Sequence, residues 1–160
     1  MLIKARAFIV GCIVLACSSC HSDDLGGAFF DGDVATRDER LSALPVERQW
    51  EIFKYGNQHR HPSATGLAVP IARRGAPALT YILNELDRQP GDLDLRDSLV
   101  VFQTMQWGKF YDICADRSVL GRIEKNQARI RDEQWRVVYR EMFGNLCSVG
   151  RVSASQQQEK

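Results

Sequence analysis

The residues with the most metal-binding chemistry are His59 and His61, because imidazole nitrogens are common ligands of zinc and related metals. The two histidines lie two residues apart, but no Cys, Asp or Glu close by in the sequence completes a ligand set. A loop in which both imidazoles contact the last carbonyls of a preceding helix explains the pair equally well. We therefore expect no metal and no cofactor, and keep His59 and His61 as second-choice metal candidates.

Three carboxylates lie within six residues, at Asp92, Asp94 and Asp97. A calcium loop would need an oxygen ligand where Arg96 stands, then a glycine and a distal glutamate. Those residues are missing. Carboxylates at the start of a helix accept hydrogen bonds from free amides and interact favourably with the helix dipole, so the cluster predicts a helix beginning here.

Seven basic residues and only three acidic ones fall between residues 117 and 140. Arg122, Lys125 and Arg129 recur at i, i+3 and i+7, a spacing that puts them on one face of a helix. This face is our candidate interaction surface, for anionic lipid headgroups or for an acidic protein. Two alternatives stay open: a solvated helix face, and pairing with the acidic segment 85–97.

The signatures of common catalytic sites are missing from the sequence. It contains no Gly-x-Ser-x-Gly, no His-Glu-x-x-His and no phosphate-binding glycine loop. The only Cys-x-x-Cys spacing joins Cys17 to Cys20, outside any strand–helix context that a redox site would need. We assign no catalytic residue and do not expect an enzyme.

The chain has 160 residues, of which 44% are hydrophobic and 26% charged, as in an ordinary single globular domain. Its first six residues carry Lys4 and Arg6, and an apolar run follows over residues 7–16. Ten helical residues span only about 15 Å, half of a bilayer core, so residues 1–16 are typical of a cleaved signal peptide. Without them, 19 basic residues face 20 acidic ones, which gives no reason to expect a nucleic-acid partner.

The segment Val14-Leu15-Ala16-Cys17 resembles the lipobox of bacterial lipoproteins. The resemblance implies a lipidated cysteine, acylated with palmitate-type chains, that anchors the protein to a membrane of the cell envelope. Cys17 is the expected lipid site; Cys20 and Cys12 are the alternatives. In a Gram-negative host, Ser18 after the lipidated cysteine implies the outer membrane, with the protein facing the periplasm.

Cys114 and Cys147 remain in the folded part of a chain anchored in this way. An oxidising compartment favours a disulfide between them. The alternative is two separate buried thiols, since a free cysteine packs like a small hydrophobic residue.

The rest of the chain divides into a tether, a helical domain and a tail. Residues 17–41 are polar and rich in glycine, so we expect a lipidated flexible tether, with Phe29-Phe30 as an exception that docks on the domain or on the membrane. Residues 42–150 form the expected domain, and residues 151–160 a disordered tail.

Hydrophobic residues recur at helical spacing throughout this domain, and no stretch alternates as a strand would. We predict an all-α bundle of five to six helices. The predicted segments are a helix from Pro45 to near Gly56, a short helix from Thr65 to Gly75, and helices over residues 77–89, 92–107, 118–131 and 132–143.

Residues 71–105 resemble one HEAT-type repeat, an antiparallel helix pair, through Gly75, Ala78-Leu79, Ile82-Leu83 and Leu99-Val100. No second copy is visible at a spacing of 35 to 45 residues, which excludes a long solenoid. The resemblance implies binding of other proteins. Our leading hypothesis is a membrane-anchored helical protein-interaction module with an envelope protein as partner; the alternatives are a periplasmic immunity protein against a toxin and a metal-dependent envelope hydrolase using His59 and His61.

Overall fold

The computed structural model describes residues 22–148, and all the regular secondary structure in this part of the chain is helical. The predicted all-α fold is therefore confirmed, with more and shorter helices than expected. The eight α-helices and three 3₁₀ helices are α1 (Ser22–Phe30), α2 (Arg37–Ser42), α3 (Val46–His59), η1 (Thr65–Leu67), α4 (Ala68–Ala72), α5 (Ala76–Asp87), α6 (Asp92–Trp107), η2 (Ile113–Ala115), α7 (Arg117–Asn126), η3 (Gln127–Arg129) and α8 (Glu133–Leu146).

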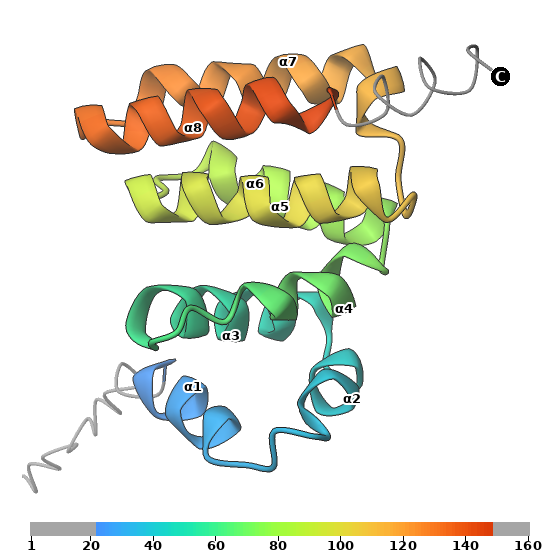
Figure 1. The fold of residues 1–160 in the computed structure, drawn as a ribbon, viewed down its shortest axis with the longest axis vertical. Helices are drawn as coiled ribbons and strands as arrows, with labels where there is room; N and C mark the ends of the chain where they lie inside the picture. Colours follow the sequence, from blue (N-terminus) through green and yellow to red (C-terminus); the bar gives the residue numbers. More distant parts are fainter. Residues whose placement is uncertain (1–21, 149–160) are drawn as a thin grey trace, which may run out of the picture.

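The helices are stacked in layers along the long axis of the molecule (Figure 1). α7 and α8 form one end, α5 and α6 the middle, α3 and α4 the next layer, and α1 and α2 the other end. α6 packs against both α4 and α8, and α5 packs against both α3 and α7. The middle layer is therefore covered on both sides.

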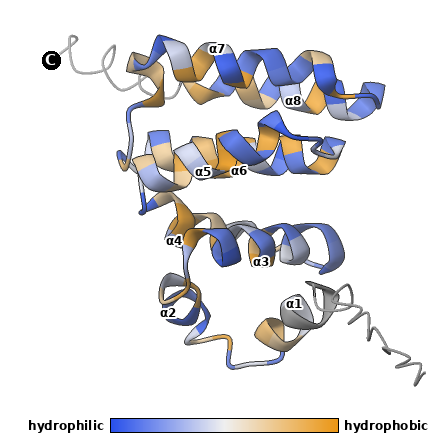
Figure 2. Ribbon diagram, turned by 180° about the vertical axis from the view of Figure 1, so that it is seen from behind, coloured by the Kyte–Doolittle hydropathy of each residue, from blue (hydrophilic) through white to orange (hydrophobic). Residues whose placement is uncertain are grey.

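This central position explains the sequence of α5 and α6. Pro77 suits the first turn of α5, where a missing N–H costs nothing, and apolar residues then follow at helical spacing. α6 is buried on most of its surface because helices cover it on two sides, and hydrophobic ribbon segments gather there and on α4 (Figure 2). The buried hydrophobic side chains of the two helices are Ala78, Leu79, Ile82, Leu83, Leu86, Leu95, Leu99, Val101, Phe102 and Met105.

The last two layers repeat each other at a spacing of 41 residues. α5 follows its N-cap residue Gly75 and α7 follows Asp116, while α6 follows Gly91 and α8 follows Asp132. The caps are glycines in one layer and aspartates in the other, so the repeat is one of backbone geometry and escapes a search for similar residues. A second helix pair therefore follows the first at a spacing between 35 and 45 residues, although the sequence shows no similar copy there.

The prediction that residues 17–41 form a flexible tether is wrong for the residues that the structure describes. Helices α1 and α2 occupy most of this segment, and they pack against α3 and α4 respectively. Phe29 and Leu41 belong to the hydrophobic core. Of the two docking places expected for Phe29-Phe30, the structure shows the domain.

Arginine side chains stabilise this region, which is why its polar composition misleads. The guanidinium of Arg40 lies 4.7 Å from the ring centre of Phe29, and it also donates hydrogen bonds to the backbone oxygens of Phe29 and Asp33. A Cβ atom at Gly32 would lie 2.5 Å from the same guanidinium, so a side chain there would displace Arg40 from this position. The charged residues cover the aromatic rings instead of keeping the segment in solvent.

Some predicted boundaries also shift. α3 continues past Gly56 to His59, because the Phe30 ring occupies the place where a side chain at position 56 would lie, so the glycine serves packing and does not end the helix. α7 ends at Asn126, before the predicted residue 131, and a 3₁₀ turn follows. The signal peptide 1–16, the lipid-site candidates Cys17 and Cys20, and the tail 151–160 lie outside the described residues.

Candidate functional site

The three neighbouring carboxylates of α6 have three different roles. Asp94 accepts a hydrogen bond from the backbone N–H of Gly91 and thereby caps its own helix. Asp92 instead accepts hydrogen bonds from the backbone N–H groups of Arg131 and Asp132, just before α8. These bonds, that of Asp132 foremost, lower the pKa of Asp92. Asp92 therefore ties the start of α8 to the start of α6.

Asp97 lies one turn further along α6 and is fully buried. Its carboxylate accepts hydrogen bonds from Asn57 Nδ2 at 2.6 Å, from Gln58 Nε2 at 2.9 Å and from Arg96 Nε at 2.8 Å. The Arg96 guanidinium lies 4.9 Å from the ring centre of Trp135 on α8. The cluster thus connects three layers of the stack through one buried charge.

Burial raises the pKa of Asp97, and its hydrogen bonds to Gln58, Arg96 and Asn57 only partly oppose this. A carboxyl group with a raised pKa is a candidate general acid or base. Here, however, the group is enclosed by its own partners, and no part of it reaches solvent. We interpret the cluster as structural, since a catalytic group must touch its substrate.

The two histidines are not brought together with other metal ligands. His59 is the last residue of α3 and packs beside the Tyr55 ring, with 5.0 Å between ring centres. His61 is exposed in the following loop, before a cis proline bond at Pro62. Among residues 22–148, no group of three or more His, Cys, Asp or Glu side chains is placed to hold a metal ion.

The predicted basic face is largely used inside the molecule. Arg122 forms an ion pair with Asp87 at 2.5 Å, and Arg129 donates hydrogen bonds to the backbone oxygens of Leu86 and Arg88. Arg129 also lies in η3, beyond the end of α7, so the helical spacing does not extend to it. Pairing with the acidic segment 85–97 therefore describes Arg122. Arg129 contacts the same segment through the segment's backbone oxygens, and Lys125 is exposed.

Cys114 and Cys147 form a disulfide, with 5.8 Å between their Cα atoms. Cys114 belongs to η2 and Cys147 follows α8 directly. The bond therefore closes a loop that contains the whole of the α7–α8 layer.

The comparisons with known protein families, with curated proteins and with solved structures find no match. Candidate binding surfaces are therefore sought in the structure of the chain itself. In the described part of the chain, no helix has both the length and the apolar composition needed to cross a bilayer.

Two large hydrophobic side chains are exposed at the C-terminal end of α6, and the sequence analysis did not single them out. Trp107 is 48% exposed and Phe110 38% exposed, although both are large hydrophobic residues. Lys109 and Tyr111 are their neighbours in the chain, and residues 107–111 are called the α6-end loop. Three aromatic residues within five positions were the available signal, since Trp and Tyr are enriched where proteins bind each other.

The backbone of the α6-end loop is held in a defined shape. The N–H of Phe110 donates to the oxygen of Met105, and the N–H of Lys109 donates to that of Gln106, the two bonds of a Schellman motif. Lys109 occupies the left-handed position of this motif, with φ of 57°, where glycine is usual. Gly108 stands one residue earlier because a Cβ there would lie 2.4 Å from the Phe110 ring. The loop thus presents its aromatic residues from a fixed frame.

Proposed function

We propose that the chain is an envelope lipoprotein whose helical body binds another envelope protein through the α6-end loop. Residues 1–16 are removed as a signal peptide, and the lipid is attached to Cys17, or alternatively to Cys20. The observation that carries the binding role is the exposure of Trp107 and Phe110 on a hydrogen-bonded loop. Large exposed aromatic side chains on a rigid frame are typical centres of protein interfaces.

The disulfide supports the proposed compartment. Disulfides such as Cys114–Cys147 form and persist mainly in oxidising environments outside the cytoplasm. The lipobox-like segment that ends at Cys17 independently favours a location outside the cytoplasm. The layered helix pairs also suit the HEAT-type resemblance of residues 71–105, and such pairs mostly bind proteins.

The arrangement of the helices favours a partner on the side away from the membrane. The chain enters α1 at one side of the stack, whereas α6 ends at the opposite side (Figures 1 and 2). An anchor attached before Ser22 therefore leaves the C-terminal end of α6 on the side of the stack away from the start of α1. A partner in the aqueous compartment can reach it there.

The chemistry of the loop describes the matching partner surface. Trp107 and Phe110 need an apolar hollow, and the ammonium group of Lys109 favours a carboxylate at its rim. We expect a partner with exposed aliphatic residues flanked by Asp or Glu.

The test is recovery of the partner from detergent-solubilised membranes with wild-type protein and with Trp107→Ala and Phe110→Ala variants. Both variants should keep the thermal midpoint of the wild type within a few degrees, since the two side chains are exposed, and should lose a stoichiometric partner. Val137→Ala, which also removes an exposed apolar side chain, should keep it.

Two results would contradict separate parts of the proposal. Equal recovery by wild type and both loop variants would remove the α6-end loop as the binding surface. A mature N-terminal peptide without acyl mass, from protein found in the cytosolic fraction, would remove the anchor.

A further inference from the structure

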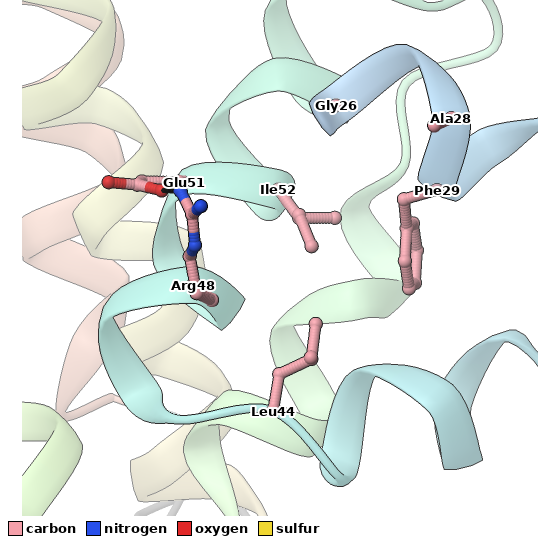
Figure 3. Close-up of a pocket in the computed structure, with 7 residues that line it drawn as sticks. All are labelled: Gly26, Ala28, Phe29, Leu44, Arg48, Glu51 and Ile52. Carbon is pink, nitrogen blue, oxygen red and sulfur yellow. Dashed lines mark hydrogen bonds and ion pairs between the residues drawn. The ribbon is translucent and has the colours of Figure 1, made fainter. Parts of the chain in front are cut away.

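A cavity of about 320 Å³ lies between α1, the turn from α2 to α3, and the first half of α3. The side chains of Phe29, Leu44 and Ile52 face this space from three segments of the chain (Figure 3). The cavity is partly open to solvent, and ligand sites commonly begin at about 300 Å³. The size of the cavity therefore points to an occupant.

The walls indicate what kind of molecule fits. Beyond the three apolar side chains, Gly26 and Ala28 add only backbone and a methyl group. The charged residues at the cavity, Arg48 and Glu51, neutralise each other in an ion pair at 2.5 Å. A space with apolar walls and no unbalanced charge suits a hydrocarbon chain.

The backbone of α1 forms one wall of the cavity. Gly26 lies so close to Tyr55 that a Cβ at position 26 would be 2.5 Å from the ring. α1 is therefore in direct contact with α3 at Gly26, while Phe29, nearly one turn later, stands across the cavity from Leu44 and Ile52 (Figure 3).

The proposed lipid site lies within reach of this cavity. From Gly26 back to Ser22 is about 6 Å along a helix. Two further residues lead to Cys20 and five to Cys17, at most about 7 Å and 18 Å of extended chain. An acyl chain spans about half of a ~30 Å bilayer core, or roughly 15 Å. A chain attached at Cys20 therefore reaches the cavity even from a fully extended linker, and a chain attached at Cys17 reaches it from any linker that brings the cysteine within about 15 Å of the cavity.

We propose that the cavity takes one acyl chain of the protein's own N-terminal lipid. The inference rests on the lipidation proposed above and adds where one of the chains lies. The remaining chains stay in the membrane, where two suffice for stable anchoring. The helical body is then held at the membrane by α1, and the α7–α8 layer lies at the far end of the stack (Figure 1).

The experiment uses the full chain made in cells supplied with a fatty acid that carries a photoactivatable diazirine. After irradiation of intact membranes, mass spectrometry should find the N-terminal lipopeptide joined to the peptides that contain Leu44 or Ile52. The Ile52→Phe and Leu44→Phe variants enlarge a side chain inside the cavity and should lower this intramolecular product severalfold. Val34→Phe, an exposed position in the loop after α1, is the matched control and should leave it unchanged.

The outcomes separate the two proposals. An acylated N-terminal peptide without intramolecular product, or with equal product in all variants, overturns the cavity occupant and leaves the anchor intact. Products that join residues 44–52 to free phospholipid instead show that the cavity takes a membrane lipid and overturn the proposed source. An N-terminal peptide without acyl mass overturns the anchor and the occupant together.

Discussion

Asp97 is a buried charge whose neighbours can only donate hydrogen bonds to it. Asn57, Gln58 and Arg96 all present N–H groups to the carboxylate. The Asn57 side-chain oxygen is also buried and has no hydrogen-bond donor near it. Burial nevertheless raises the pKa of Asp97, because loss of hydration outweighs the effect of these hydrogen bonds.

Replacing Asp97 by Asn tests this arrangement. The amide has one acceptor oxygen in place of two and brings two donors toward existing donors, so the free energy of unfolding should fall by about 2 kcal/mol at pH 7. Because the folded-state pKa of Asp97 is raised, its stabilising contribution is complete below the unfolded-state pKa and is lost as pH rises through the folded value. The stability gap between wild type and Asp97→Asn should therefore widen as pH falls through the folded-state pKa of Asp97 and level off below its unfolded-state pKa.

Urea unfolding of both proteins between pH 3 and pH 8 measures this gap, and titrations common to both proteins cancel in the difference. A gap that narrows toward acid pH would mean that Asp97 is stabilised as the anion.

Lys109 has a backbone conformation that is unfavourable for a residue with a side chain. A residue other than glycine in the left-handed region costs about 1–2 kcal/mol, and part of that is offset by the lower entropy of the unfolded lysine chain. Lys109→Gly should thus raise the free energy of unfolding by about 1 kcal/mol, as measured by urea unfolding. Arg140→Gly, on the exposed face of α8, should lower it by about 1 kcal/mol. A destabilised Lys109→Gly would mean that the lysine side chain itself holds the loop.

At the scale of elements, Arg129 stabilises the C-terminus of α5. Its guanidinium donates hydrogen bonds to the oxygens of Leu86 and Arg88, and carbonyls at the end of a helix have no partner within the helix. The positive charge also interacts favourably with the helix dipole. The basic residue that the sequence offers as an interaction surface is in this structure a contact between layers.

Arg129→Ala should therefore lower the free energy of unfolding by about 1–2 kcal/mol, the sum of two charge-assisted hydrogen bonds weakened by partial exposure. Lys125→Ala removes an exposed charge of the same cluster and should change stability by less than about 0.5 kcal/mol. Thermal or urea unfolding of the two variants distinguishes them. Equal effects would show that Arg129 acts only through net charge.

The sequence predicted best those helices in which the hydrophobic periodicity and the residues at the two ends indicate the same boundaries. α6 ends at Trp107 as expected and begins at Asp92, with Gly91 as its N-cap residue in place of the expected Asp92 or Asp94. Asp132 caps α8 by accepting the N–H groups of Gln134 and Trp135. α1 and α2 were missed because Phe29 and Leu41 are too few to show a period and because Arg40 stabilises them by covering a ring. The Asp97 cluster was missed because its partner Asn57 comes from α3, forty residues away.

At the scale of the whole molecule, the layered order means that contacts run mainly between neighbouring layers. α1 packs on α3, and α8 packs on α6, while the layer of α5 and α6 has neighbours on both sides. In such a stack, stability is approximately a sum of layer and interface contributions, so the end layers can open while the rest stays folded. The disulfide stabilises one end layer and not the other, because α7 and α8 are the α-helices that lie within its loop.

Native-state hydrogen exchange should reveal this order. The free energy of the opening that exposes the amides should be highest for α5 and α6 and lowest for α1 and α2. The amides of α7 and α8 should have intermediate values. The Cys114–Cys147 bond joins residues that are 33 positions apart in the sequence. Its reduction should lower the opening free energy of the α7–α8 layer by roughly 3–4 kcal/mol in the chain-entropy model. The opening free energies of α1 and α2 should stay unchanged, because the loop does not include them. If reduction lowers protection equally in every helix, the layers open together and the stack behaves as one cooperative unit.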